Sequence, residues 1–165
     1  MFDEMTWDFD DAQGGTSVAG RVRGLSLTSS RMDCRIHSQA GLAYLEWTFE
    51  FANQSTRQRE ARTQILLPVD GVVSRLTLWV NGEEREAAFA GRAEVREAYE
   101  KIVRQRRDPV LVTTSGPDRV LMQCFPVPPN GGTMKTRLGI TIPLSMLNQV
   151  NGKLQLPRMI ERNFN

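Results

Sequence analysis

The sequence predicts a mainly β protein, an antiparallel β-sandwich-like module of about eight or nine strands with one amphipathic α-helix packed on it. Three observations lead to this class. Apolar and polar residues alternate with a period of two over much of the chain, as in half-buried antiparallel strands. Short turn signals such as Asn81-Gly82 separate the alternating segments. One segment, at about 92–107, has the spacing of an amphipathic helix instead.

The first half of the chain contains the clearest strands. We expect them around 17–27, 31–37, 41–51, 58–67, 72–80 and 83–89. In the third, one face carries Ala43, Leu45, Trp47, Phe49 and Phe51. In the fifth, one face is expected to carry Val72, Leu76, Leu78 and Val80. Because a type I′ turn requires positive φ at both central residues, Asn81-Gly82 predicts a hairpin between the last two strands.

The helix is predicted from an apolar stripe formed by Val95, Ala98, Tyr99, Ile102 and Val103. Tyr99 is expected to anchor this stripe to the sheet. The helix ends in a basic cluster of Lys101, Arg104, Arg106 and Arg107, where cations suit the helix dipole. Asp108 and Pro109 should end the helix, since the residue before a proline avoids the α region.

The second half returns to strands, around 110–114, 119–125 and 133–142, with a short strand at Leu154–Leu156 and an irregular tail. A corner before the third of these strands should be set by Pro126, Pro128 and Pro129. The predicted organisation is an acidic N-terminal tail or linker (1–15), one domain (16–147) and a C-terminal extension or linker (148–165).

Composition limits the classes of function. The chain has 165 residues, 40% hydrophobic and 24% charged, as expected of one soluble globular domain. It shows neither a secretory signal nor an apolar run of the ~20 residues that a membrane span needs. Five acidic residues among the first eleven leave a net charge of +7 on the remainder. That excess is a weak indication of anionic partners, and the cellular compartment stays open.

A search for catalytic or metal-binding groups finds no convincing set. His37 is the only histidine, and it falls on the polar face of its strand. Cys34 and Cys124 lack the spacing of a zinc site, and whether they pair is left open. The carboxylates of Glu83, Glu84 and Glu86 are expected to keep a strand soluble and to discourage edge pairing. We therefore expect no catalytic residue, no metal and no cofactor.

Two motifs are also interpreted as architecture. Residues 130–136, "NGGTMKT", lack the full phosphate-loop pattern and precede a strand, so we interpret them as a glycine-rich turn. Asn53-Gln54-Ser55 is a glycosylation sequon, relevant only in a secretory pathway. A peptide-binding groove formed by Tyr99 and residues 125–129 is the alternative to their structural roles.

In order and spacing, several motifs resemble the VIT (vault protein inter-alpha-trypsin) domain family over about residues 16–145. They are Leu67-Pro68, Asn81-Gly82, the helix pair Ala98 and Tyr99, and the corner with Pro126, Pro128, Pro129 and Gly131. The corner carries one glycine more than the family pattern, and the chain beyond about Leu147 has no clear counterpart in it.

The resemblance implies a compact β-sandwich-like module without catalytic residues, from a larger multidomain protein of bacterial or membrane-attached type. VIT domains generally stand beside a von Willebrand A-type domain, whose Asp-x-Ser-x-Ser metal motif is absent here. In a membrane-attached parent, this domain would be extracytoplasmic.

Two functions follow as hypotheses. The first is a non-catalytic protein–protein interaction or scaffolding module of a larger protein. The alternative is an anion- or nucleic-acid-binding domain that uses Lys101, Arg104, Arg106 and Arg107 at the basic end of the helix. No aromatic residues interleave with these arginines, so no specific nucleic acid is expected.

Overall fold

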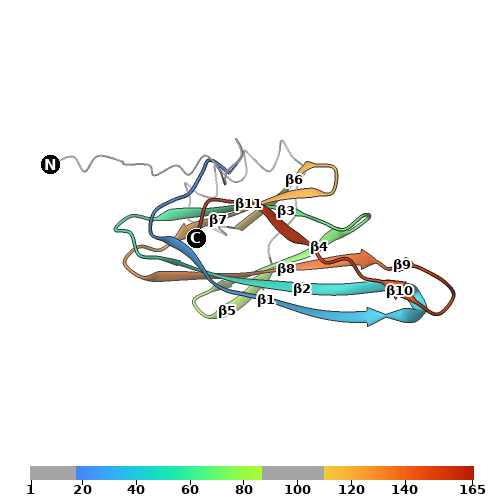
Figure 1. Cartoon of the computed structure of the whole chain (residues 1–165). Coiled ribbons are helices and arrows are strands. Elements are labelled where there is room, and N and C mark those ends of the chain that lie inside the picture. The colour runs from blue at the N-terminus through green and yellow to red at the C-terminus, as the bar shows by residue number, and fades with distance from the viewer. Residues whose placement is uncertain (1–17, 87–109) are drawn as a thin grey trace.

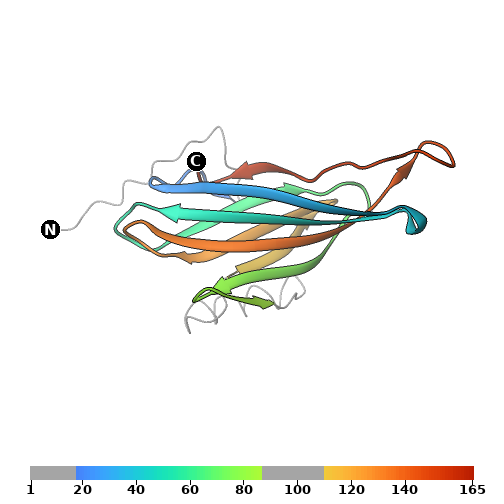
Figure 2. The same cartoon turned by 90° about the horizontal axis from the view of Figure 1, so that it is seen from below.

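A computed structural model describes residues 18–86 and 110–165, which form two antiparallel sheets packed face to face (Figures 1 and 2). The five-stranded sheet has the order β1 (Leu25–His37), β2 (Leu42–Asn53), β8 (Gly132–Pro143), β4 (Val72–Val80) and β5 (Glu83–Glu86). The four-stranded sheet has the order β11 (Arg158–Arg162), β3 (Arg59–Leu66), β7 (Arg119–Val127) and β6 (Val110–Gly116). A small hairpin joins β9 (Ser145–Met146) to β10 (Gly152–Lys153), and η1 (Ser38–Ala40) is a 3-10 turn.

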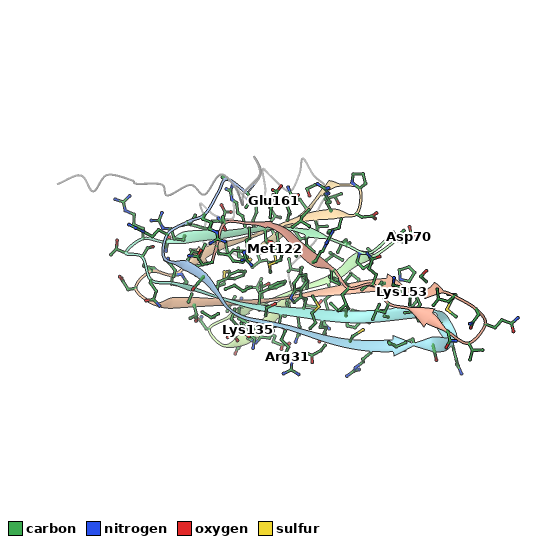
Figure 3. All side chains as sticks on the ribbon, in the orientation of Figure 1. Arg31, Asp70, Met122, Lys135, Lys153 and Glu161 are labelled. Atoms are coloured by element: carbon green, nitrogen blue, oxygen red, sulfur yellow. The ribbon has the colours of Figure 1, made fainter. Side chains whose placement is uncertain are left out.

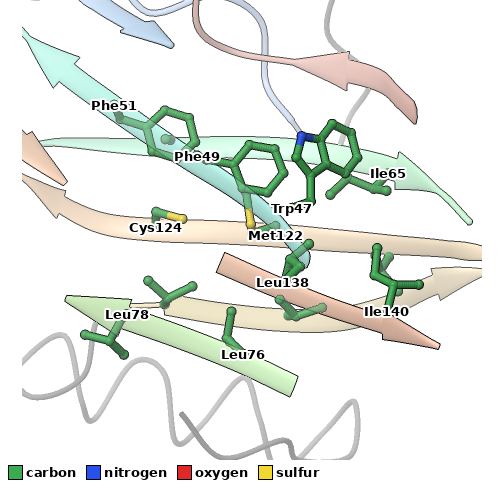
Figure 4. Packing of buried hydrophobic residues seen from close by; sticks show 14 of the residues in the cluster. Trp47, Phe49, Phe51, Ile65, Leu76, Leu78, Met122, Cys124, Leu138 and Ile140 are labelled. Atoms are coloured by element: carbon green, nitrogen blue, oxygen red, sulfur yellow. The ribbon is translucent and has the colours of Figure 1, made fainter. Parts of the chain in front are cut away.

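The core lies between the two sheets and is organised around β2. Its side chains Trp47, Phe49 and Phe51 form a row that faces the four-stranded sheet (Figure 4). The ring centroids of Trp47 and Phe49 are 4.7 Å apart, and those of Phe49 and Phe51 are 6.3 Å apart. Met122 of β7 lies between the layers (Figures 3 and 4) and is fully buried. The period-two pattern of β2 therefore places its apolar face in the core, as predicted.

The mainly β, antiparallel class is confirmed, and so is the hairpin at Asn81-Gly82. Asn81 and Gly82 have φ values of 53° and 81°, and Val80 pairs with Glu83 across the turn. The predicted helix at about 92–107 lies outside the described residues. Among the residues that the structure describes, the one helical segment is the η1 turn.

Two details of the strand predictions for the first half of the chain are wrong. The strand expected around 17–27 begins only at Leu25 and continues without a break into the one expected at 31–37. The second error concerns Val72, expected on the same face as Leu76. The register of β4 against β8 shifts between Val73 and Arg75. Because such a bulge reverses the alternation, Val73 packs against the core and Val72 is 59% exposed.

The C-terminal segment 148–165, expected as an extension or linker with an irregular tail, adds a strand to the sandwich. Residues Leu154–Leu156 are not a strand; β11 follows them and pairs with β3. Asn163 then binds β3 through its side chain, accepting from the Arg62 N–H at 2.7 Å and donating to the Glu60 carbonyl at 2.9 Å. Phe164 is fully buried. The sequence signal was weak because this strand carries one apolar pair and three charged residues.

The prolines of the predicted corner lie where β7 connects to β8. Pro126 follows a cis peptide bond, and Pro128 and Pro129 lie between the two strands. Gly131 has a φ of +82°, which favours glycine. A Cβ on Gly132 would lie 2.6 Å from the carbonyl oxygen of Pro128. Gly131 is thus favoured by its backbone conformation, and Gly132 by the lack of space for a side chain.

One end of the sandwich projects beyond the four-stranded sheet. The β1–β2 hairpin and the β9–β10 hairpin extend past it (Figures 1 and 2). The apolar side chains of Cys34 and Ile36 share a face with the buried row of β2 but are exposed, because they lie on the edge strand. The same sequence pattern therefore produces a buried face in β2 and a partly exposed one in β1.

Candidate functional site

The outer face of the five-stranded sheet carries a network of charged and aromatic side chains, and it is the candidate site. Its strands come from distant parts of the sequence, so adjacent positions are set by register. Glu50 stands opposite Lys135, and Thr77 stands opposite Arg137. Figure 3 shows Arg31 and Lys135 on the side of this sheet that faces away from the core.

Trp79 is the centre of the network. The ammonium nitrogen of Lys135 lies 4.5 Å from its ring centroid, and the guanidinium carbon of Arg137 lies 5.0 Å from it. Both cations are within the range of cation–π attraction. Arg137 also pairs with Glu84 of β5 at 3.1 Å and approaches Glu46 of β2 at 3.9 Å. These contacts connect β2, β8, β4 and β5 across the sheet.

Tyr44 forms the second part of the face and lies over a glycine. A Cβ on Gly139 would collide with the Tyr44 hydroxyl and lie 2.8 Å from the Cβ of Arg75. The Tyr44 hydroxyl donates to the Glu46 carboxylate at 3.5 Å. The missing side chain at Gly139 is therefore what leaves room for the end of the Tyr44 ring over β8.

Ion pairs complete the face. Arg75 pairs with Glu86, and the hydrogen bond and charge of that carboxylate raise the pKa of Arg75. Lys135 pairs with Glu50 at 3.6 Å, with both side chains about 40% exposed. Exposed pairs of this kind contribute only ~0–1 kcal/mol each to the free energy of unfolding. The ion pairs therefore add little to the stability of the fold. Their clearer consequence is that they order a surface of mixed charge.

The basic cluster predicted from the sequence is not part of this face. Residues outside the described part of the chain include Tyr99, Lys101, Arg104, Arg106, Arg107, Asp108 and Pro109. Anion or nucleic-acid binding by this cluster stays a prediction, and so does a groove formed with Tyr99.

Other predicted positions are placed by the structure. His37 is exposed at the end of β1. Glu83, Glu84 and Glu86 are exposed on β5, an edge strand, as expected. Cys34 and Cys124 are both free thiols, on strands of different sheets, so they do not pair.

The sequon at Asn53 is structural. The Asn53 side chain is fully buried, and its amide nitrogen donates to the carbonyl oxygens of Arg57 at 2.7 Å and Val127 at 3.0 Å. Its amide oxygen accepts from the N–H of Ser55 at 3.0 Å. A glycan on this nitrogen would be incompatible with these bonds, so the asparagine holds the turn after β2 against the proline corner.

The sequence alone did not single out Tyr44, Trp79 or Arg137. Alternation places each of them on a polar strand face, but nothing in the sequence says that β2, β8 and β4 are neighbours. Within the described residues, no group of three or more His, Cys, Asp and Glu side chains is placed to hold a metal ion. No helix in 18–86 or 110–165 is long and apolar enough to span a membrane.

A comparison with family models supports the sequence resemblance. A search of curated proteins finds no match. The family model of the vault protein inter-alpha-trypsin domain matches residues 27–140, from within β1 into β8, which is more than half of the chain. The match covers the hairpin, the proline corner and most of both sheets. This chain therefore belongs to the VIT domain family.

Proposed function

We propose that this VIT domain is a non-catalytic protein–protein interaction or scaffolding module of a larger protein, and that the outer face of the five-stranded sheet contacts the partner or neighbouring domain. The observation that carries the proposal is the ordered network around Trp79. Tryptophan, tyrosine and arginine are the residues that most often dominate binding energy at protein interfaces. Here all three occur on one sheet face.

The mixed charges favour a specific protein surface over a uniformly charged polymer. The face carries Lys135, Arg137 and Arg75 beside carboxylates on β2 and β5. A polyanion would meet those carboxylates, whereas a folded partner can present opposite charges at matching positions. Family membership supports a neighbouring domain as the partner, and a von Willebrand A-type domain outside this chain is the first candidate.

Site-specific photo-crosslinking in the full-length parent protein tests the proposal. A benzophenone amino acid at Glu50, which is 44% exposed on the outer face, should form a covalent adduct with the partner or neighbouring domain. The matched control is the same amino acid at Arg158, which is exposed on the other sheet. Trp79→Ala should reduce the Glu50 adduct. Equal adducts at Glu50 and Arg158, or an adduct at Glu50 that Trp79→Ala leaves unchanged, would contradict the proposal.

A further inference from the structure

We propose that a second copy of this domain binds along the edge of β1, in an antiparallel strand pair centred on Cys34. The two five-stranded sheets would then join into one continuous sheet. This inference does not depend on the outer-face proposal, because it concerns the edge strand β1 and not the network around Trp79 on β2, β8, β4 and β5. It rests on the open edge, the direction of the backbone groups and the self-complementary sequence of residues 32–36.

Most of the β1 edge has no neighbour among the described residues. Within residues 18–86 and 110–165, β1 is the terminal strand of its sheet and pairs only with β2. Its first residues are covered, because Leu27 donates to the carbonyl of Asn165 at 2.8 Å and Leu25 accepts from the N–H of Asn165 at 3.1 Å. A register shift lies between Leu27 and Ser29. From Ser29 to His37 the strand contains neither a proline nor a further bulge, which are common protections of an edge.

The backbone groups of Met32, Cys34 and Ile36 point toward this open edge. Leu144 donates to the carbonyl of Gly41 at 2.8 Å, one position beyond the Leu42–Pro143 pair, so this bond gives the phase of hydrogen bonding between β2 and β8. Because hydrogen-bonded and non-hydrogen-bonded positions alternate, the odd-numbered residues of β2 bind β8. The backbone N–H and C=O groups of the β1 residues opposite them therefore point away from β2, toward the open edge. Those pairs are Ile36 with Ala43, Cys34 with Leu45 and Met32 with Trp47.

The sequence of the edge is complementary to itself in one register. With Cys34 opposite Cys34 of the second copy, Met32 stands opposite Ile36 and Asp33 stands opposite Arg35. Each apolar residue then meets an apolar residue, and each carboxylate meets a guanidinium. Centring the pair on Asp33 or on Arg35 would instead place like charges opposite each other, which is destabilising in antiparallel pairs.

Centring the pair on Met32 also gives complementary charges, but it is less complete. Arg31 would stand opposite Asp33, while Cys34 would meet Ser30 and Ile36 would meet Thr28 in the irregular part of the strand. The Cys34-centred register alone uses all three apolar side chains. Ile36 is 60% exposed and Cys34 is exposed, so both are accessible to a second copy.

The pairing should be weak and reversible. A seam of two seven-residue segments falls at the small end of specific interfaces, where transient complexes are found. Cys34 makes such a complex detectable. Hydrogen-bonded antiparallel residues have Cα atoms ~5.5 Å apart, which is within the range that a disulfide spans.

Oxidative crosslinking is the first test. With oxidised glutathione, two Cys34 thiols would form one intermolecular disulfide and reduce the oxidant to two molecules of glutathione, with no other reactant. The matched control is the double variant Cys34→Ser, Ile36→Cys, whose thiol lies on the same face of the same strand. In the proposed register, the two introduced cysteines of the paired copies are offset by four residues along the strands. Their Cα atoms are then roughly 13 Å apart, and no disulfide can form between them. Faster dimer formation through Cys34 than through the control is expected; equal rates would overturn the register.

Charge exchange is the second test, read by sedimentation equilibrium under reducing conditions. Asp33→Arg and Arg35→Asp should each weaken dimerisation by roughly tenfold, because two opposite-charge pairs become like-charge pairs. The double variant Asp33→Arg, Arg35→Asp should restore it. A chain that stays monomeric at the highest attainable concentration overturns the proposal, as does a double variant no better than the single ones. The variant Trp79→Ala should dimerise normally. A failure of the outer-face proposal can therefore be distinguished from a failure of this one.

Discussion

Replacing Phe164 by alanine should destabilise the whole sandwich, although this residue lies next to the end of the chain. Phe164 is fully buried, and its ring meets Phe51 edge-on, with centroids 5.0 Å apart and an interplanar angle of 67°. Removing a buried phenylalanine side chain costs about 3–5 kcal/mol, because the lost apolar contacts leave a cavity. The edge-on aromatic pair accounts for ~0.5–1.5 kcal/mol of such a loss.

The assay is equilibrium unfolding in urea, with thermal unfolding as a second measurement. The denaturation midpoint should fall while the slope stays the same, because the surface exposed on unfolding hardly changes. For a domain of this size, the loss corresponds to a decrease in Tm of roughly 6–20 °C. The matched control is Leu156→Ala in the same C-terminal segment. Leu156 is 53% exposed, so its truncation should change the free energy of unfolding by less than ~0.5 kcal/mol.

The reasoning would be refuted if Phe164→Ala cost less than ~1 kcal/mol, well below the expected range for a buried phenylalanine. It would also be refuted if both alanine variants had the same effect. Either outcome would mean that the C-terminal segment is not part of the core, and that the sandwich is complete without β11.

Four further predictions test other parts of the structure. Asn53→Ala should lower the free energy of unfolding by ~1–3 kcal/mol in urea titrations, because the carbonyl groups of Val127 and Arg57 lose their donor and the first of these bonds is buried. In native protein, a thiol reagent should modify Cys34 and leave Cys124 unmodified until urea is added; equal rates would show that Cys124 is not buried. Burial raises the pKa of Cys124 far above its unfolded value of ~8.5, so stability should fall as the pH rises past that value, and Cys124→Ala should reduce this dependence. Gly139→Ala should displace Tyr44 and perturb its resonances in NMR spectra, whereas unchanged Tyr44 signals would contradict the close packing.

Much of the fold was predictable because its signals are local. A strand with one buried face alternates along its own length, so β2 could be recognised without knowing its neighbours. The hairpin at Asn81-Gly82 and the corner at Pro126, Pro128 and Pro129 are equally local, since they depend on the backbone angles that these residues allow. The order of these elements also carried the family resemblance that the match over 27–140 bears out.

The errors arose where the outcome depends on distant parts of the chain. Val72 was assigned to the wrong face because a register shift against β8 interrupts the alternation of β4. β11 was missed because its pairing with β3 and the burial of Phe164 need partners about 100 residues away. No local pattern contains those contacts.

The sequence by itself therefore determined the strand pattern, the turns and the family, because alternation and backbone preference are properties of short segments. Only the tertiary structure decided which strands are neighbours, and with them the candidate site. Arg137 meets Trp79, and Tyr44 covers Gly139, because β2, β8 and β4 are adjacent in the sheet, and Cys34 is exposed because β1 lies at its edge. The sequence specifies which side chains are available, but long-range strand pairing decides which of them are neighbours on the surface.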